Sequence, residues 1–481
     1  MKVQAAHHIE RQVILLAAPD QAVAQTAQTR IAALWGEPAW LAQLDDLFSE
    51  LAPAGTHLYV EAIHLDLGGL DMAQLEGQFS ARLTEALRQQ LTEAAAQARF
   101  YGEAKPSPSQ LAGSAVQYKS PSQLLWEAFA HFLVNGQLPF YTDWGNFATF
   151  TDDFVQQALQ FNADEKRAMR ALLLKNPIAC LRYARYLGEA RVWASLAALA
   201  PDVAVVSLAT RCWAQMVTLV MNKPQLRDEW LVFLIERALA NQNPTLEALE
   251  IFLAENLLSL PPNFTPTGWA TIRFQSHNVG QPHSEDEISP ALLTERLAEA
   301  AEILGNLSTT EEVHYLPNAG LVVLHPFFAA CFTTCGWLAE DHFKDDLSRE
   351  KAIRLLHFLA TGEPAAAEYA LTLPKVLCGA PLYWPLESEI VLTANELAEG
   401  VALLEAAIGH WSALKNTSPE GLREGFLQRE GRLAREMGGW VLTVEQKAQD
   451  VLLGRLPYGW GLGLIRLPWL AENLRIEWVY G

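Results

Sequence analysis

The chain has 481 residues, enough for two to four domains; half of them are hydrophobic and only 19% are charged. That composition excludes an intrinsically disordered chain, because such chains are poor in apolar residues and rich in one charge. A net charge of −20 disfavours binding to nucleic acid or to an anionic membrane surface. The charge is uneven: residues 411–481 hold nine basic and eight acidic residues, so residues 1–410 carry −21.

The cysteines and the N-terminus indicate a cellular compartment. Five cysteines, an odd number spread over a long chain, do not form the pattern of a disulfide framework. The apolar run from Val13 to Pro19 is shorter than the core of a secretory signal, and no stretch is long enough to span a bilayer. We therefore predict a protein with reduced thiols that is made, and first works, in the cytoplasm.

Residues 1–100 are predicted to form a small α+β domain with the element order βαβα. Two segments alternate polar with apolar residues, as strands do, and two carry apolar residues at helical spacing. Asp71 stands where a helix N-cap is expected. The predicted elements are strands His7–Leu16 and Leu58–Leu67 and helices Ala22–Leu51 and Asp71–Ala98.

Residues 101–122 are rich in proline and serine and are predicted to be a linker. A helical middle domain follows at 123–259, in which short helices pack in antiparallel pairs. Neither a sustained heptad nor a fixed repeat occurs, which disfavours a long coiled coil and a solenoid. The predicted helices are Leu124–Asn135, Asp152–Phe161, Asp164–Leu174, Pro177–Leu187, Val192–Leu199, Val203–Val220, Asp228–Ala240 and Thr245–Leu258.

A second linker is predicted at 260–290, and an α+β domain at 291–481. The last domain begins with helices and ends in short extended segments. Those segments are Trp440–Glu445, Leu462–Leu467 and Leu474–Tyr480. The predicted fold class is therefore a mainly α-helical multidomain chain, in which small α+β units at both termini flank a helical middle domain.

The common catalytic motifs for nucleotide hydrolysis, zinc proteolysis and esterase chemistry do not occur in the sequence. The best candidates for a metal site combine cysteines one helical turn apart with scattered histidines: His314, His325, Cys331, Cys335 and His342. Cys378 is a candidate nucleophile, and Asp345-Asp346 and Glu285-Asp286-Glu287 are candidate carboxylate clusters. Buried thiols and solvated acidic loops account for these residues more simply. We predict no catalytic residue, cofactor or metal, and hold a Cys or zinc enzyme as a minor alternative.

An arginine series near the C-terminus alternates with glutamates: Arg423, Arg429, Arg432 and Arg435 with Glu424, Glu430 and Glu436. On a helix, Arg432 and Glu436 would be i,i+4 partners on a salt-bridged face exposed to solvent. The functional alternative is a protein-docking face, because arginine binds carboxylates through two parallel hydrogen bonds. We keep the four arginines as candidate docking residues.

Several ordered strings in the C-terminal part carry a resemblance to a known family. They are Pro317–Phe327, Arg354–Gly362, Leu373–Gly379, His410-Trp411, Lys415–Gly431 and Leu464–Trp469. In this order they resemble the tape measure protein family of contractile injection systems, the phage-tail-like particles of bacteria. His8–Gln12 and Leu65–Gly68 are similar to the start of the same family.

The resemblance implies a structural assembly protein and no catalytic residues. Such a protein would occupy the lumen of the growing inner tube, set the tube's length and contact inner-tube, baseplate, spike or cap proteins. A fully helical chain of this length would reach about 720 Å, whereas a compact body has a radius of gyration near 23 Å. Either the chain extends during assembly or it is a folded end component. The alternative function is an α-helical adaptor that binds a cargo effector or an assembly ATPase.

Overall fold

The computed structural model divides the chain into two compact units, residues 1–128 with 140–143 and residues 129–139 with 144–481. Among the described helices, none has the length and apolarity needed to cross a membrane. The description covers residues 9, 12, 14–34, 37–51, 57–60, 62–97, 99–100, 116–119, 121–139, 147–220, 224–242, 313–387, 390–414, 417–436, 439–457 and 459–478.

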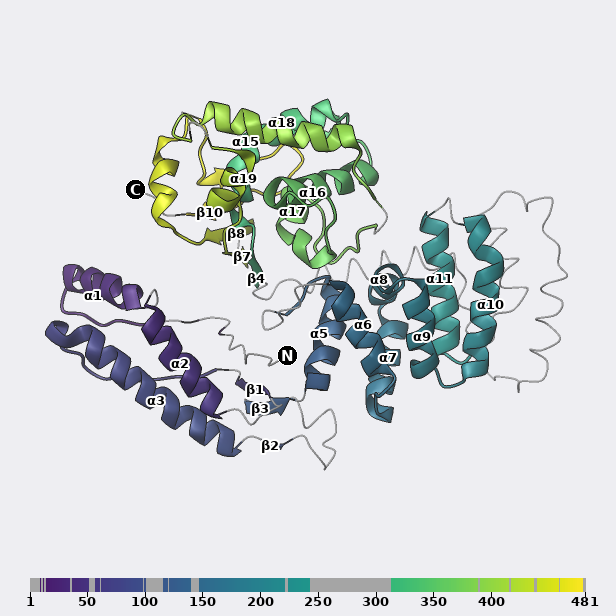
Figure 1. The fold of residues 1–481 in the computed structure, drawn as a ribbon, viewed down its shortest axis with the longest axis horizontal. Coiled ribbons are helices and arrows are strands. Elements are labelled where there is room, and N and C mark those ends of the chain that lie inside the picture. Colours follow the sequence, from purple (N-terminus) through teal and green to yellow (C-terminus); the bar gives the residue numbers. More distant parts are fainter. Residues whose placement is uncertain are drawn as a thin grey trace. The chain divides into compact units, whose positions relative to one another are not determined.

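The described residues of the first unit form helices α1, α2 and α3, the short helix η1, a small sheet and the start of the helix that begins at Pro121 (Figure 1). Helices α1 and α2 both pack on α3 around Ile31, Trp40 and Phe79. In the sheet, β3 lies between β1 and β2, antiparallel to β1 and parallel to β2. The elements are α1 (Gln21–Leu34), α2 (Pro38–Leu51), β1 (His57–Val60), the 3-10 helix η1 (Met72–Gln74), α3 (Leu75–Gln97), β2 (Arg99–Phe100) and β3 (Val116–Lys119).

Of the two strands in the predicted order βαβα, the first is not observed in its described residues and the second is confirmed over part of its length. In the predicted strand His7–Leu16, the described residues form no strand, and Ile14, Leu15 and Leu16 are exposed. The predicted strand Leu58–Leu67 pairs only over β1; beyond it, residues 62–67 keep an alternation of burial without a partner strand. Alternation specifies which side chains are buried, but a strand also needs a neighbour for its backbone groups.

Two other features of the first unit bear on the predictions. Asp71 is confirmed as an N-cap, since its side chain accepts a hydrogen bond from the Ala73 N–H. Strand β3 lies inside the stretch 101–122 that we predicted to be a linker. The division into domains and linkers is otherwise still a prediction.

Seven helices match the predicted helices of the middle region. The part of the second unit that they form, from Phe129 to Gln242, is called the helical array here. Short connections with strong caps separate its helices: Asn162 forms a capping box with Glu165, and Asn176 caps the helix that Pro177 begins. The helices are α5 (Pro121–Asn135), α6 (Phe147–Ala158), α7 (Ala163–Lys175), α8 (Pro177–Leu187), α9 (Glu189–Leu199), α10 (Val203–Val220) and α11 (Pro224–Leu239). The predicted helix Thr245–Leu258 lies outside the described residues.

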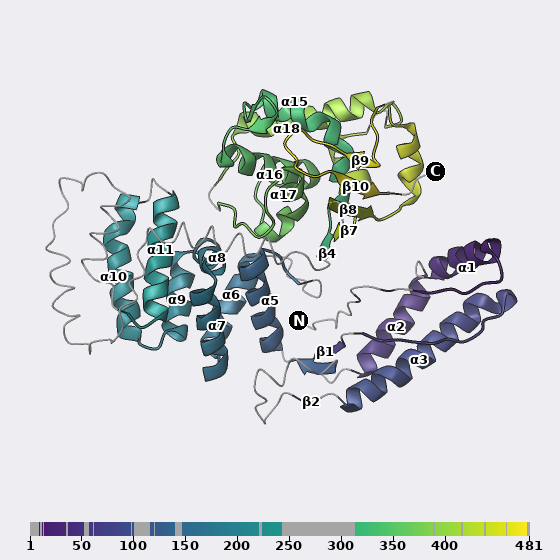
Figure 2. The ribbon, with the colours of Figure 1, turned by 180° about the vertical axis from the view of Figure 1, so that it is seen from behind.

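Residues 313–478, called the C-terminal domain here, combine helices with a five-stranded sheet of order β4-β7-β8-β10-β9 (Figure 2). Only the β8–β10 pair is parallel. The strands are β4 (Val313–Leu316), β7 (Gly431–Glu436), β8 (Gly439–Val444), β9 (Leu464–Ile465) and β10 (Leu474–Glu477), and β5 (Leu338–Ala339) pairs with β6 (His342–Phe343) separately. The predicted extended segments in this domain are confirmed at β8, β9 and β10, with β9 shorter than expected.

The helices of the C-terminal domain enclose one apolar cluster that includes Phe328, Leu356 and Trp411. Its longest helices are α15 (His325–Thr334), α16 (Asp346–Thr361) and α18 (Ala394–His410). The shorter ones are α17 (Thr372–Leu377), α19 (Pro419–Leu422), the π-helix η4 (Arg423–Leu427) and the 3-10 helices η2 (Ala319–Leu324), η3 (Glu368–Leu371) and η5 (Ala448–Arg455). The described chain is thus mainly α-helical, as predicted.

Candidate functional site: a buried polar clasp

Six consecutive carbonyl groups lie at the centre of the candidate site. They belong to Leu382–Glu387, called the clasp segment here, which has no helical or strand structure. Each carbonyl oxygen accepts a hydrogen bond from a side chain; in chain order the donors are Lys375, Arg182, Lys375, Arg185, Tyr186 and Arg354. Because buried carbonyls need partners, these side chains take the place of a neighbouring strand.

The donors reach the clasp segment from two parts of the second unit. Lys375 and Arg354 belong to the C-terminal domain, whereas the other three donors lie on α8 of the helical array. The carbonyls of Leu382 and Trp384 bind Lys375, while that of the intervening Tyr383 binds α8. The clasp segment therefore fastens the helical array to the C-terminal domain.

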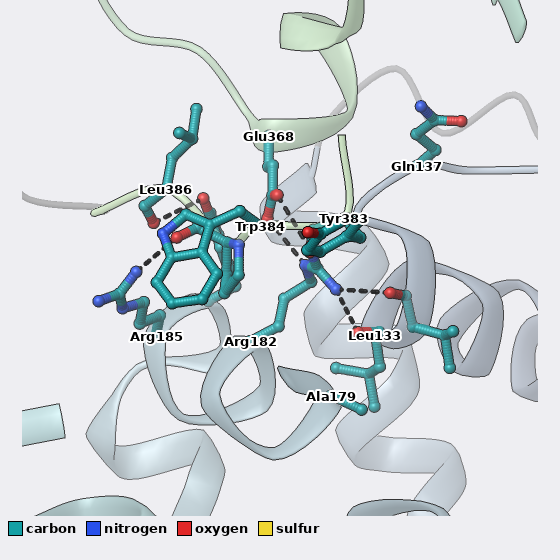
Figure 3. Close-up of polar contacts among 12 residues, drawn as sticks. Leu133, Gln137, Ala179, Arg182, Arg185, Glu368, Tyr383, Trp384 and Leu386 are labelled. Atoms are coloured by element: carbon teal, nitrogen blue, oxygen red, sulfur yellow. Dashed lines mark hydrogen bonds and ion pairs between the residues drawn. The ribbon is translucent and has the colours of Figure 1, made fainter. Parts of the chain in front are cut away.

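Arg182 is fully buried on α8 and donates five hydrogen bonds, the full capacity of a guanidinium group (Figure 3). Its Nε lies 2.9 Å from Glu368 Oε2, and its Nη2 lies 3.2 Å from Glu368 Oε1 and 2.6 Å from the Tyr383 carbonyl. Its Nη1 donates to the carbonyls of Val134, at 3.0 Å, and Leu133. Both carbonyls belong to the last turn of α5, where carbonyl groups have no hydrogen-bond partner within the helix. The negative end of the helix dipole also lies there, so a cation at this position is stabilised.

Glu368 and Lys375 bring the C-terminal domain's own charges to the clasp. Lys375 Nζ lies 2.5 Å from Glu368 Oε1, 3.1 Å from the Leu382 carbonyl and 2.9 Å from the Trp384 carbonyl. These three acceptors match the three N–H donors of an ammonium group, so the geometry fits a charged lysine. One buried carboxylate is therefore shared by two cations, one from each side of the clasp.

A second ionic group lies beside the first. Arg185 Nε lies 2.7 Å from Asp228 Oδ2, and Arg227 Nη2 lies 3.0 Å from Asp228 Oδ1. The two arginines also approach the carboxylate of Glu387 at 3.5 and 3.4 Å. The end of the clasp segment is held by Glu350, which accepts a hydrogen bond from the Glu387 N–H at 2.8 Å. The helical array and the C-terminal domain thus both contribute charged groups, and the arginines of this group lie next to carboxylates.

Gly136 leaves the space into which the ionic group fits. It follows α5 with a φ of +75°, where residues with a side chain are strained. A Cβ at this position would lie 2.6 Å from Glu368 Oε1 and 3.0 Å from Arg182 Nη2. The glycine therefore both ends the helix and permits the close approach of the carboxylate.

The protonation of the cluster follows from its burial and its partners. Burial raises the pKa of Glu368, but attraction to Arg182 and Lys375 outweighs burial, so the pKa lies below the usual value. Burial, together with repulsion from Arg182, lowers the pKa of Lys375 despite its attraction to Glu368. Both oxygens of the Glu368 carboxylate are occupied by donors. The arrangement is suited to holding two parts of the chain together.

Two of the four candidate docking arginines lie inside the C-terminal domain. Arg429 is fully buried and binds Asp450 at 2.8 Å, and Arg423 is 7% exposed and donates to the Leu359 carbonyl at the end of α16. The prediction of docking through these two residues is therefore wrong, because the surrounding core takes up their guanidinium groups. Arg432 and Glu436 are not i,i+4 partners on a helix, since the chain turns after η4 into strand β7.

Arg432 and Arg435 lie on β7 and are half-buried. Arg435 pairs with Glu472 at 2.8 Å and lies over the ring of Trp440, with its guanidinium carbon 5.1 Å from the ring centre. Arg432 faces Thr443 of β8 in the sheet register. Docking through Arg432 and Arg435 therefore remains a hypothesis.

The remaining candidate residues are dispersed. Among the described residues, no three His, Cys, Asp or Glu side chains gather to hold a metal ion. A hydrogen bond from Cys331 lowers the pKa of Cys335, and burial raises that of Cys378. His325 contacts the Val322 carbonyl, Asp345 caps α16, Asp346 pairs with Arg349, and His314 and His342 lie on β4 and β6. The cluster Glu285-Asp286-Glu287 lies outside the described residues.

Sequence reasoning missed the clasp, although a signal was present. Arg182 and Arg185 interrupt an otherwise largely apolar helix, and Lys375 is the single charge in Leu371–Gly379. An isolated charge in an apolar run indicates a buried polar contact. The partner could not be named, because Glu368 is 186 residues away from Arg182 in the sequence.

Comparison with known proteins identifies the family. Residues 6–478 match the profile of a family described as "Contractile injection system tape measure protein". No curated protein and no solved structure matches the chain. The match spans the first unit, the helical array, the clasp and the C-terminal domain. The chain therefore belongs to the contractile injection system tape measure protein family.

Proposed function

We propose that this protein sets the length of the inner tube of a contractile, phage-tail-like particle. The observation that carries the proposal is the family match over residues 6–478. The role is structural: the buried polar cluster described above fastens two parts of the chain together. The protein would act in the cytoplasm during assembly and lie in the tube lumen.

The partners in this proposal are inner-tube, baseplate, spike or cap proteins, with an assembly ATPase as a further class. Arg432 and Arg435 of β7 are the proposed docking residues. Removing residues 411–481 would not test this, because Trp411, Leu442 and Ile476 belong to the apolar core. Arg432→Ser combined with Arg435→Ser is the better test, since reduced particle incorporation of a folded variant supports docking and unchanged incorporation contradicts it.

Tube lengths measured by electron microscopy test the ruler. Cells would carry the gene, lack it, or carry a 20-residue insertion at one of three places. Two insertions lie in candidate measuring segments, the α9–α10 turn at Pro201 and the predicted linker 260–290. The matched control insertion lies in the exposed turn between Glu340 and Asp341.

Each added residue lengthens the span by about 1.5 Å if helical and by about 3.5 Å if extended. A ruler predicts tubes longer by about 30 to 70 Å for an insertion in the measuring segment, and broad or absent tubes without the gene. Tubes of unchanged length with all three insertions, together with failed assembly without the gene, would contradict a ruler and indicate a folded end component.

A further inference from the structure

The contacts between the helical array and the C-terminal domain differ in kind from the contacts inside each. The apolar cluster of the C-terminal domain runs from Leu316 to Trp478 and contains no residue of the array. The array has its own buried residues, such as Phe129, Phe154 and Trp230. The two parts therefore have separate apolar cores, and the clasp between them is built from charges and carbonyl groups.

A buried polar interface has a particular physical property. The attraction between buried charges is largely offset by the cost of removing them from water, so such pairs add little net stability while demanding exact geometry. When the interface opens, water solvates the charges and the carbonyls on both sides. Opening a polar interface therefore exposes much less apolar surface than unfolding either core does.

The length of chain between the two parts allows them to separate. Gln242 and Val313 are joined by 70 residues, whose reach is at most about 240 Å. This span is ten times the radius of gyration of about 23 Å expected for a compact body of this size. Moving these two parts apart would therefore lengthen a chain that has to extend along a tube.

We propose that the clasp is a release point, at which the helical array and the C-terminal domain separate as folded bodies when the protein enters the growing tube. This proposal rests on the proposed function, since only tube assembly requires the chain to lengthen. Glu368 is the central contact, because its carboxylate binds a cation from each side. Separation breaks the bonds that Arg182, Arg185 and Tyr186 donate to the C-terminal domain and leaves the Glu368–Lys375 pair within that domain.

Hydrogen exchange on the full-length protein tests independent opening. Glu368→Gln weakens the clasp. The matched control is Asp152→Asn, which alters an exposed ion pair with Arg191 inside the helical array. Peptides covering α8 and the clasp segment are expected to exchange at least about 100-fold faster in Glu368→Gln. Peptides covering α16 should stay more protected than the clasp peptides in wild type and variant, because α16 exchanges only when the C-terminal core unfolds. Equal protection of α16 and of the clasp peptides would mean that the second unit opens only as a whole, which would overturn the proposal.

A milder variant tests the proposal even if Glu368→Gln fails to fold. Tyr186→Phe removes the hydroxyl that lies 3.1 Å from the Leu386 carbonyl and keeps the ring. Loss of one hydrogen bond predicts exchange about 2- to 10-fold faster in the clasp peptides. Unchanged exchange in those peptides would count against the proposal.

Assembled particles separate this proposal from the proposed function. If the wild-type chain is incorporated and its clasp peptides lose the protection seen in the free protein, release is supported. If it is incorporated with the clasp still protected, release is refuted while the assembly role stands. If the chain is absent from particles and from assembly intermediates, the proposed function fails, and release during assembly fails with it.

Discussion

Removing the charge of Glu368 should destabilise the second unit far more than removing a surface charge. In Glu368→Gln the side chain keeps its size, but Arg182 and Lys375 face each other without a counter-ion in a fully buried site. Breaking a buried pair by removing one partner costs about 3 to 5 kcal/mol. Asp152→Asn removes a partner that is 54% exposed, so solvent screens the lost pair and the cost should be far smaller.

Urea unfolding followed by tryptophan fluorescence and by circular dichroism measures both free energies, and coincident transitions justify a two-state treatment. Arg182→Met completes a double-mutant cycle with Glu368→Gln. Since the two side chains bind directly, the double variant should lose at least about 1 kcal/mol less than the two single losses combined. A cost for Glu368→Gln equal to that of Asp152→Asn, or strictly additive single losses, would refute the structural reasoning.

Three further predictions concern single positions. Gly136→Ala should lower the melting temperature, because φ is +75° and the new Cβ would meet a carboxylate at 2.6 Å. Gly77→Ala on α3 is the control, since its Cβ would enter open space and the change should be neutral or stabilising. Equal effects of the two substitutions on the melting temperature would contradict this reasoning. Burial lowers the pKa of His357 to about 4 from 6.5, so the unfolded state binds its proton first as pH falls. The free energy of unfolding should then fall by about 3 kcal/mol between pH 6.5 and 4, and His357→Phe should flatten that slope in urea titrations at several pH values; an unaltered slope would exclude His357 as its source. Arg429→Met should lower the melting temperature by several degrees, while Arg435→Met should leave it nearly unchanged; the reverse order would show that Arg429 is not a core residue.

Local signals in the sequence were sufficient for the helical array. The predicted helices Pro177–Leu187 and Val203–Val220 have the observed bounds. A helix is specified by nearby residues, namely apolar spacing, an Asn cap before Pro177 and a glycine at 188. The mainly α-helical class, with strands near both ends, could therefore be read from the sequence.

Strands and the clasp depended on residues far away in the chain. Val116–Lys119 became a strand because β1 and β2 supply partners on both sides, and Arg432 lies on a strand because β4 and β8 flank it. Strand pairing and buried charge pairs join residues at large sequence separation, so no local pattern names the partner. The tertiary structure alone placed Arg182 beside Glu368, because only the folded chain brings together the two cations and the carboxylate that each needs once buried.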